Sequence, residues 1–414
     1  MRLNRASVLV CVFVAAMFLL PVSALGGGDS RAAQKDWTIL MYWDADNSLE
    51  FCTEFALSTW EKALPSNEDV NIVALVDLLS VEGTWIWEFV DGERQLVEEW
   101  AELNTSDPET LEMFVEYGMA QFPADKTMVV LQDHGYSWRG ICVDETNGDT
   151  LMTVDMIGNA LEDVKADMGK GVDLLAFDAC NMMNIEIVYE LKDAVPYVVG
   201  SQSMVPFDGL PYMMFITDLV ANPGLTPAEL ATNIVYEYVE YYSSKKDYEH
   251  IMTYNQDFAT ASAVDTSKLD ALGDAFGQLA DVLLPLIEEN KKTIEEARGY
   301  AMITQWANVA GWEWNPDLMT LVEGLREIPG CPELTDAIDT FELAFHDAVF
   351  AEAHSKRYKD TASGLGVWFP PSLAQYNSMG YVWAQQFVYH DIGLDLVAET
   401  SWYDCLMTYF ASAK

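Results

Sequence analysis

A histidine and a cysteine each follow an apolar block of this sequence, and the two residue types together could perform acyl transfer. The stretch KTMVVLQDHG ends at His134 and Gly135, and the stretch VDLLAFDAC ends at Cys180. A thiol attacks a carbonyl carbon as the thiolate, so it needs a nearby base or cation to lose its proton near neutral pH. A histidine at the end of a neighbouring strand supplies that base.

Small residues flank both positions. Gly135 leaves space where a substrate backbone must approach, and its N–H and that of Cys180 are candidate donors to the oxyanion of a tetrahedral intermediate. Taken singly, a buried cysteine is usually a small hydrophobic residue, and a lone histidine is more often a satisfied polar residue. The pair is more informative, because both follow apolar strands of similar length and have Gly135 or Ala179 beside them.

The elements around these residues predict an α/β fold. Buried apolar strands alternate with helices, which indicates a mostly parallel sheet with helices on both faces. Ligands bind such sheets beyond the carboxyl ends of the strands, where His134, Cys180 and the acids of WDADN are expected.

In chain order we expect a strand in WTILMYW, a helix to about Leu64, a strand over 70–77, a hairpin about Asp91-Gly92, a helix over 108–122, the strand before His134, a polar loop YSWRGICVDETNGDT, a helix over 154–168, the strand before Cys180, a helix over 185–191 and a strand in PYVVGSQ.

The chain beyond Asn222 has a mainly helical pattern. One late strand is expected in SGLGVWFPP, over 363–371. The predicted organisation is therefore a core over 37–221, followed by a helical region over 222–414 whose late strand completes the fold.

The first residues have the features of a secretory signal peptide. Two arginines precede an apolar run from Val8 to Leu20, and small residues follow up to Ala24, after which we expect cleavage. Residues 1–24 would then be the signal peptide. The alternative is an uncleaved anchor, because Ser7 to Leu25 nearly reaches the ~20 residues that span a bilayer. Either outcome places the rest of the chain outside the cell, secreted or on the extracellular face of the membrane.

The charge balance excludes polyanionic partners. The chain has 22 Lys+Arg against 66 Asp+Glu, a formal net charge of −44. Such a surface repels nucleic acid and anionic lipid and attracts cationic substrates. We therefore expect no nucleic-acid partner, and a membrane association only if the signal segment stays uncleaved.

Five cysteines remain after removal of the signal segment: Cys52, Cys142, Cys180, Cys331 and Cys405. The number is odd, so at least one thiol stays unpaired within the chain even in an oxidising compartment. The sequence leaves the pairing of the other four open. It contains no C-x-x-C or H-E-x-x-H motif and its five histidines are scattered, so no transition-metal site is predicted.

The order of these motifs resembles that of the caspase-like cysteine peptidases, and within that group the clostripain family. The similarity runs from Trp37 to about Phe410, and its most specific parts are the His-Gly and Asp-Ala-Cys blocks. It is carried by WTILMYWDADNSLE, LQDHGYSW, FDACNMMNIEIVYEL, VGSQSMVPFDGLPY, NPDLMTLVEGL, SGLGVWFP and TSWYDCLMTYF. The resemblance implies a caspase-like sheet sandwiched by helices, with Cys180 as nucleophile and His134 as general base and acid.

The resemblance also implies that Asp178 and Asp208 select a basic side chain before the scissile bond. Residues two apart in an extended segment face the same way, so Asp178 is expected on the side of Cys180. A partly desolvated carboxylate there would select a cation. Asp208 in PFDGLPY has an equally good explanation as a turn aspartate before glycine.

Two departures from the family pattern stand out. Gln202 and Ser203 occupy positions where the family usually has acids, which predicts a less acidic pocket rim. No Lys or Arg lies between Arg139 and Lys165, which puts in doubt the family's usual self-cleavage at a basic site there. Calcium is a possible accessory ion by the same resemblance, although DADNSLE lacks the glycine and distal glutamate of an EF-hand. No organic cofactor is expected.

The sequence thus predicts a secreted cysteine endopeptidase that cleaves polypeptides after Arg or Lys through a Cys180–His134 dyad. One alternative is a caspase-like peptidase that prefers Asn or Asp. The other is a catalytically silent binding protein of the same fold, against which the joint presence of His134, Gly135 and Cys180 argues.

Overall fold

The computed structural model describes residues 34–63, 68–243, 258–301, 314–377 and 387–412. Gln34–Lys414 forms one compact unit. The predicted signal segment, 1–24, lies outside the described residues. No helix in the described ranges has the length and apolar character needed to cross a membrane.

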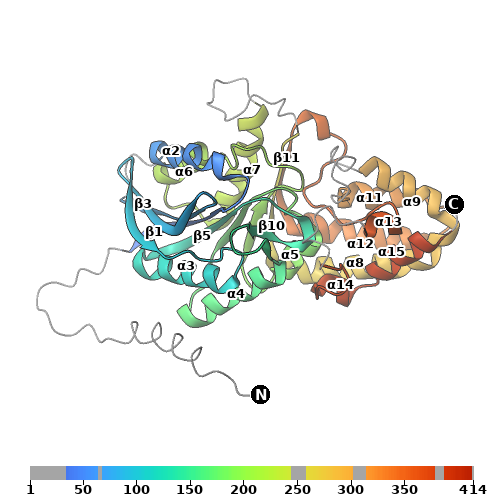
Figure 1. The fold of residues 1–414 in the computed structure, drawn as a ribbon. Helices are drawn as coiled ribbons and strands as arrows, with labels where there is room; N and C mark the ends of the chain where they lie inside the picture. The colour runs from blue at the N-terminus through green and yellow to red at the C-terminus, as the bar shows by residue number, and fades with distance from the viewer. Residues whose placement is uncertain (1–33, 64–67, 244–257, 302–313, 378–386, 413–414) are drawn as a thin grey trace, which may run out of the picture. The chain divides into compact units, whose positions relative to one another are not determined.

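A mixed, mostly parallel sheet dominates the first half of the fold (Figure 1). Within the described residues it has nine strands in the order β11-β10-β9-β8-β5-β1-β2-β3-β4. The central strands β9, β8, β5, β1 and β2 are parallel, and two antiparallel strands extend each edge. The strands are β1 (Lys35–Ala45), β2 (Val70–Leu78), β3 (Val81–Val90), β4 (Glu93–Trp100), β5 (Ala124–Gln132), β8 (Leu174–Asp178), β9 (Tyr197–Gly200), β10 (Thr260–Asp265) and β11 (Val349–His354).

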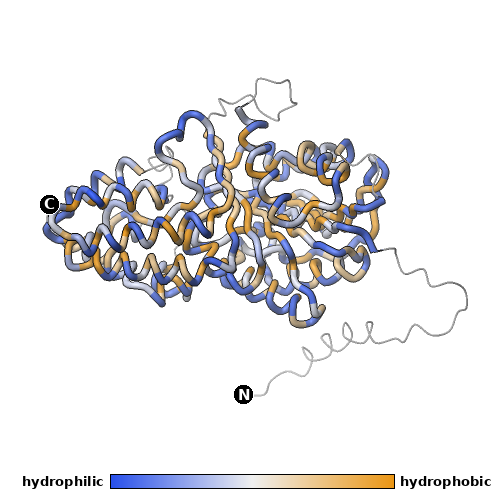
Figure 2. Tube along the Cα trace, turned by 180° about the vertical axis from the view of Figure 1, so that it is seen from behind, coloured by the Kyte–Doolittle hydropathy of each residue, from blue (hydrophilic) through white to orange (hydrophobic). Residues whose placement is uncertain are grey.

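Alternating residues of the central strands enter two separate cores. In β1, Leu40 and Tyr42 pack into one core and Ile39 and Met41 into the other. This explains why the parallel strands read as unbroken apolar runs, because both of their faces are covered. Figure 2 shows the hydrophobic residues concentrated along the central strands, with hydrophilic positions on the outward faces of the helices.

Helices cover both faces of the sheet, as the sequence predicts. One core contains residues of α3, α4, α5, α8, α9, α11, α12, α14 and α15, and the other contains residues of α2, α6 and α7. The helices are α2 (Thr53–Ala63), α3 (Pro108–Gln121), α4 (Val154–Met168), α5 (Ile185–Glu190), α6 (Tyr212–Ala221), α7 (Pro227–Ser243), α8 (Leu269–Leu283), α9 (Ile287–Ala301), α11 (Leu318–Gly324), α12 (Pro332–Ala348), α13 (Leu373–Tyr376), α14 (Asp395–Glu399) and α15 (Trp402–Ala411). The fold class is therefore α/β, as expected.

The strand predicted over 363–371 is wrong. In that segment the described backbone makes only isolated bridges, from Gly366 to Asn184 and to Asp317. The N–H of Gly366 donates to the carbonyl of Met183 at 2.8 Å, and the carbonyl of Gly366 accepts from Ile185. The apolar run is buried because it lies between two loops. Hydrogen bonds from these loops satisfy its backbone N–H and C=O groups, as a neighbouring strand would in a sheet. The second half instead contributes β10 and β11, whose alanine-rich sequences gave little strand signal.

The polar loop predicted after His134 also has structure of its own. It contains a short 3-10 turn, Ser137–Arg139, and a two-stranded hairpin of β6 (Ile141–Asp144) and β7 (Thr150–Met152). The hairpin buries Ile141 and Met152 in the larger core. The sequence predicted a loop here because the polar residues of this segment lie near the turn of the β6–β7 hairpin and not in its strands.

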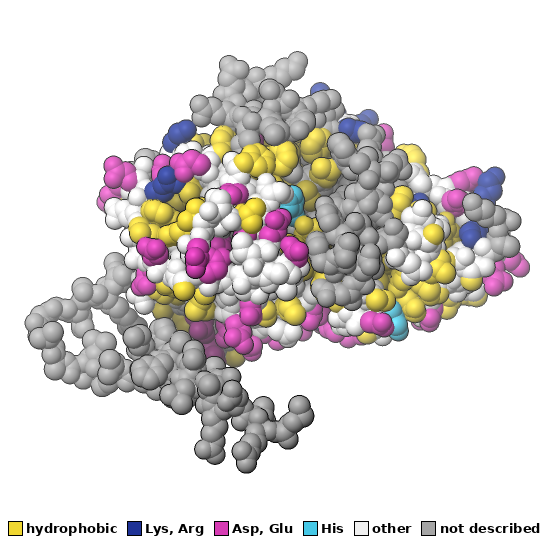
Figure 3. Space-filling model, viewed as in Figure 1, with side chains coloured by type: hydrophobic (Ala, Val, Ile, Leu, Met, Phe, Trp, Pro, Cys, Tyr) yellow, Lys and Arg dark blue, Asp and Glu magenta, His cyan; other side chains and the backbone are white. Residues whose placement is uncertain are grey.

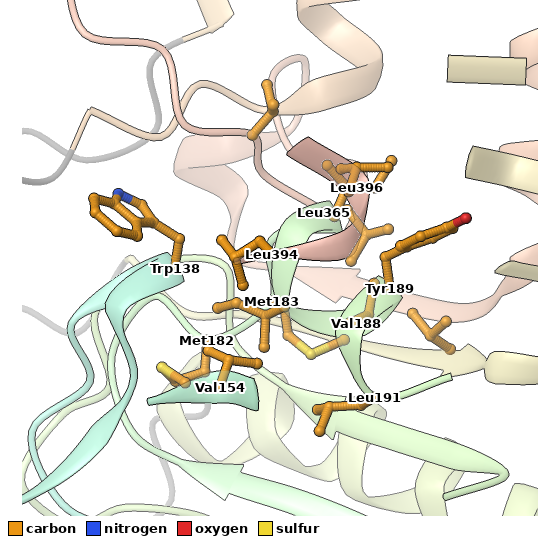
Figure 4. Packing of buried hydrophobic residues seen from close by; sticks show 14 of the residues in the cluster. Trp138, Val154, Met182, Met183, Val188, Tyr189, Leu191, Leu365, Leu394 and Leu396 are labelled. Atoms are coloured by element: carbon orange, nitrogen blue, oxygen red, sulfur yellow. The ribbon is translucent and has the colours of Figure 1, made fainter. Parts of the chain in front are cut away.

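The segment after Cys180 is fixed by the second half of the chain. Met182 and Met183 are fully buried, and they pack with Leu365 and Leu394 around α5 (Figure 4). Residues far apart in sequence therefore hold the loop that carries the cysteine.

Truncation of the central strand should destabilise the protein strongly. Leu40 in β1 is fully buried, and Leu40→Ala should lower the free energy of unfolding by about 2–5 kcal/mol because it removes apolar contact and leaves a cavity. Chemical denaturation measures the change. The control Leu343→Ala removes the same atoms from a side chain that is 76% exposed, and should change stability by less than about 0.5 kcal/mol. Equal effects of the two substitutions would contradict the assigned core.

Candidate active site

The pairing of β5 with β8 brings the histidine and the cysteine together. The two strands are parallel, and Gln132 at the end of β5 lies opposite Asp178 at the end of β8. His134 and Cys180 each follow two residues later, so both leave the sheet at the same edge. They line one cavity of about 340 Å³, together with Trp43, Leu49, Cys52, Gln132, Asp133, Asp178, Ala179, Met204, Val205, Pro206, Phe207, Gly209 and Phe258.

Gly135 lies directly against the backbone of Cys180. A Cβ atom at this position would collide with the carbonyl group of Cys180 and would lie 3.0 Å from its backbone nitrogen. Only glycine allows this approach. The two residues predicted to donate to an oxyanion therefore have their backbones in contact.

Ser48 orients the imidazole of His134. Its Oγ lies 2.8 Å from Nε2 of the histidine, and burial lowers the pKa of His134 below its usual value of 6.5. The imidazole is thus neutral, and able to accept a proton, over most of the physiological pH range. No local pattern of the sequence indicates this contact, because it joins residues 86 positions apart.

A loop after β9 surrounds the thiol of Cys180. The backbone N–H of Val205 lies 3.3 Å from Sγ and donates to it, which stabilises negative charge on the sulfur. The neighbouring Asn181 has a φ of 59°, and its N–H donates to the carbonyl of Ser203 at 2.8 Å. This sharp turn ends β8 and leaves the thiol partly exposed at the cavity.

Gln202 and Ser203, the departures from the family pattern, do not line the cavity. The amide of Gln202 donates to Asp317 at 3.0 Å, and its Oε1 accepts from the N–H of Gly364 at 2.7 Å. Both side chains are buried. Gln202 therefore ties the cysteine loop to the second half of the chain and does not form the pocket rim.

Asp178 forms a buried, acidic part of the cavity wall. The hydroxyl of Tyr212 donates to its Oδ2 at 2.5 Å. Burial raises the pKa of Asp178 to about 6; hydrogen bonds from Tyr212 and from the N–H of Leu210 oppose the rise, and the charge of Asp208 adds to it. The carboxylate is therefore ionised at neutral pH, and no basic residue is among its hydrogen-bond donors in the described part of the chain.

Asp208 lies behind this wall. It is 8% exposed, accepts a hydrogen bond from Tyr241 at 3.2 Å and is not among the residues that line the cavity. Its neighbour Gly209 lines the cavity instead, packed so closely on the carboxylate of Asp178 that a Cβ would collide with it. Asp208 thus acts on the cavity through its charge and through the turn that it begins.

The five cysteines in the described part of the chain form no disulfide with one another. Cys52 shares the cavity with Cys180, but burial, with the charges of Asp178 and Asp208, raises the pKa of Cys52 to about 12. Burial likewise raises the pKa of Cys405 to about 12 and that of Cys142 well above its usual value. These three thiols are therefore protonated and unreactive at neutral pH.

A mostly parallel sheet with a thiol and an imidazole at adjacent strand ends is the architecture of the caspase-like cysteine peptidases. A model of the clostripain family matches residues 41–360. The chain belongs to this family, the C11 peptidases, and is a cysteine endopeptidase.

Individual relatives agree with this assignment. Clostripain of Hathewaya histolytica is 24% identical over 439 aligned positions, which cover 88% of this chain and 82% of clostripain. A secreted C11 cysteine protease from Bacteroides thetaiotaomicron, solved with an irreversible peptide inhibitor, is 20% identical with a TM-score of 0.65, over 89% of this chain and 99% of that one. An inactive zymogen C11 protease from Parabacteroides distasonis is 19% identical with a TM-score of 0.58, over 91% and 97%. The two structures share the fold.

Thiol reactivity should separate the cysteines into two groups. In the native protein, an aromatic disulfide reagent at pH 7.5 should modify Cys180 and Cys331, which are partly exposed, before Cys52, Cys142 and Cys405. The buried three should react only after unfolding, because their thiolates are suppressed by burial. Mass spectrometry of the modified protein assigns each site. Fast modification of Cys52 in the native state, or a disulfide joining any two of the five, would contradict this structure.

Proposed function

We propose that this peptidase hydrolyses peptide bonds after Arg or Lys, with Cys180 as the nucleophile and His134 as the general base and acid. The observation that supports the proposal best is the single cavity in which a thiol, an imidazole and an ionised carboxylate meet. Each of these three groups has one role in the proposed hydrolysis.

The reaction begins when His134 takes the proton of the Cys180 thiol and the thiolate attacks the carbonyl carbon of the substrate. The backbone N–H groups of Gly135 and Cys180 stabilise the oxyanion that forms. His134 then gives its proton to the leaving amine, and a thioester remains on Cys180. Water, deprotonated by His134, hydrolyses the thioester and releases the acid product and the free thiol.

Asp178 supplies the proposed preference for a basic side chain. Its carboxylate lines the cavity and its partners are neutral donors, Tyr212 and the N–H of Leu210. A substrate guanidinium or ammonium group would complete a charge pair in this buried place. Asp208 strengthens the negative potential from behind. An acidic substrate side chain would be repelled, which argues against the preference for Asp.

Polypeptides with accessible basic residues are thus the proposed substrates. We further propose that the protein is exported, with residues 1–24 as the signal peptide. The secreted relative from Bacteroides thetaiotaomicron supports this location.

Neutralisation of the proposed specificity carboxylate should impair cleavage after Arg. Asp178→Asn should lower kcat/KM for an Arg peptide by about 10²-fold or more, because loss of one partner of a desolvated charge pair costs about 2–5 kcal/mol. A fluorogenic peptide panel that varies only the residue before the cut measures it, and Asp193→Asn on the exposed surface is the matched control. Full activity of Asp178→Asn on Arg, or equal wild-type activity on Asn peptides, would overturn the basic preference. Loss of all cleavage in Cys180→Ala tests the nucleophile separately.

The pH profile should contain two acidic ionisations. His134 accepts a proton only when neutral, and burial lowers its pKa, so the loss of kcat on acidification should begin below pH 6.5. Asp178 binds a cation only when ionised, and its pKa is about 6, so KM for Arg peptides should rise as the pH falls through that value. Steady-state kinetics between pH 4.5 and 8 separate kcat from KM. A KM that is constant across this range would show that Asp178 does not bind the substrate charge.

A further inference from the structure

Three basic residues lie together in one short turn of this acidic chain. Lys356, Arg357 and Lys359 occupy three of four consecutive positions directly after β11, and the backbone there forms a 3-10 turn over Lys356–Tyr358. All three side chains belong to exposed residues. The chain has 22 basic residues against 66 acidic ones, so such a group departs from its general charge. The peptidase reaction proposed above does not use these residues.

The charges of this basic turn are not neutralised by neighbouring acids. Among the described residues, no ion pair involves any of its three cations. Arg94 and Arg326, by contrast, each contact two or more carboxylates. The basic turn is therefore a small positive patch on a molecule whose surface shows many acidic and few basic side chains (Figure 3).

The strand order places the basic turn at the edge of the sheet that carries the thiol. β10 is antiparallel to β9, so it begins at the edge where β9 ends. β11 is antiparallel to β10, and its last residue, His354, lies opposite Thr260 at the start of β10. The basic turn therefore leaves the sheet on the same side as the loops that follow β8 and β9, and Cys180 lies in the first of these loops.

The basic turn is joined directly to the wall of the active-site cavity. The N–H of Ser355 donates to the carbonyl of Ala259 at 2.8 Å, and the preceding residue, Phe258, lines the cavity that contains Cys180. Ser355 and Tyr358 are both buried. They anchor the basic turn on either side of its first two cations, so that these cations stay at the rim of the cavity.

A buried tyrosine of α7 provides a second link between the basic turn and the site. Burial raises the pKa of Tyr238 well above its usual value, and the charges of Asp178 and Cys180 and the phenol of Tyr358 add to the rise. Tyr238 therefore lies within electrostatic range of the active site and also of the basic turn. Both links place the three cations near the cavity and not on a remote part of the surface.

The direction of the proposed reaction decides which part of a substrate passes the basic turn. His134 protonates the leaving amine, so the substrate residues after the cleaved bond lie toward β5, and those before it extend toward β9 and β11. β9 and β10 separate β8 from β11, and three strand spacings of ~4.8 Å make about 14 Å. An extended chain rises ~3.3 Å per residue. A substrate that crosses the strand ends therefore reaches the basic turn about four residues before the cleaved bond.

We propose that the basic turn binds an acidic side chain of the substrate about four residues before the cleaved bond. The inference rests on the proposed function, because it extends the same substrate site. Lys356 and Lys359 are three positions apart and lie on the same side of a 3-10 turn, where both reach one carboxylate. The remaining surface repels acidic peptides, so the attraction is confined to this position. The preferred substrates are then polypeptides in which an acidic residue precedes the basic one by a few positions.

The rival explanation is that the basic turn is itself a substrate. An enzyme that cleaves after Arg or Lys meets exposed residues of both types here. The backbone is folded, however: the N–H of Tyr358 donates to the carbonyl of Ser355 at 3.0 Å, and that of Lys359 to the carbonyl of Lys356 at 3.4 Å. Mass spectrometry of the purified enzyme should find this segment intact. A cut within it that is present in the active chain and missing from Cys180→Ala would overturn the proposal.

The experiment compares fluorogenic peptides that differ only in one charge. Each has Arg at the first position before the cleaved bond, and either Glu or its isostere Gln at one of the second to fifth positions. With Glu at or next to the fourth position, kcat/KM should be about three- to tenfold higher than with Gln, as expected for a charge that faces a few partly exposed cations. The difference should lie in KM, because the contact is the same before and during the reaction. It should disappear in about 1 M salt, where the charges are screened.

Two triple variants decide the assignment. The first replaces the cations of the basic turn and should abolish the preference for Glu: Lys356→Gln, Arg357→Gln and Lys359→Gln. The control makes the same change in charge at three lysines that do not line the cavity, and should retain the preference: Lys165→Gln, Lys268→Gln and Lys292→Gln. Equal preference in the two variants, whether retained or lost, would overturn the proposal. Melting temperatures within about 2 °C of the wild type show that both variants fold.

Peptide binding to the Cys180→Ala chain gives a readout that does not depend on cleavage. Calorimetry should show the same three- to tenfold difference in Kd between the Glu and Gln peptides, as expected for such exposed charge pairs. If this difference is present but the active enzyme does not cleave after Arg, the proposed specificity fails and the role of the basic turn stands. If cleavage after Arg is efficient and the difference is absent, the role of the basic turn fails alone. Failure of both peptides to bind would also overturn it.

Discussion

The parallel pairing of β5 with β8 is the constraint on which the site depends. Gln132 and Asp178 lie opposite each other at the two strand ends, and a shift of one residue in either strand would turn His134 or Cys180 to the other face of the sheet. The contact between Gly135 and the backbone of Cys180 also fixes this register, because no larger residue than glycine fits between the loop after β5 and the loop after β8. Hydrophobic residues on both faces hold these strands, so the geometry of the site is a consequence of the packing of the core.

The second half of the chain holds in place the loop that forms one side of the cavity. The segment around Gly366 inserts between the loops of Asn184 and Asp317, and Gln202 joins the cysteine loop to Asp317 and Gly364. These contacts fix the loop after β9, whose Val205 donates to the sulfur of Cys180. These contacts thereby hold the thiol of Cys180, which follows the short strand β8, in one position.

Buried acids set the electrostatics of the site. Within the described residues, the carboxylates near the cavity have neutral hydrogen-bond donors as partners, as Asp178 has Tyr212, and burial raises the pKa of Asp178 and of Cys52. The same burial lowers the pKa of His134. The cavity therefore combines a negative wall with a neutral base, which suits the attraction of a cation and the removal of a proton from a thiol.

The sequence by itself determined the α/β class, the central strands and the positions of His134, Gly135 and Cys180 at strand ends, because apolar runs, glycines and strand order are local signals. It also indicated Asp178, since alternation along a strand is local. Only the tertiary structure decided which segment of the second half joins the sheet: the apolar run around Gly366 is buried between loops, whereas alanine-rich β10 and β11 pair with β9. Likewise, only the fold placed Ser48 on His134 and Asp208 behind the cavity wall. These contacts join residues tens of positions apart, and no local pattern of hydrophobicity encodes them.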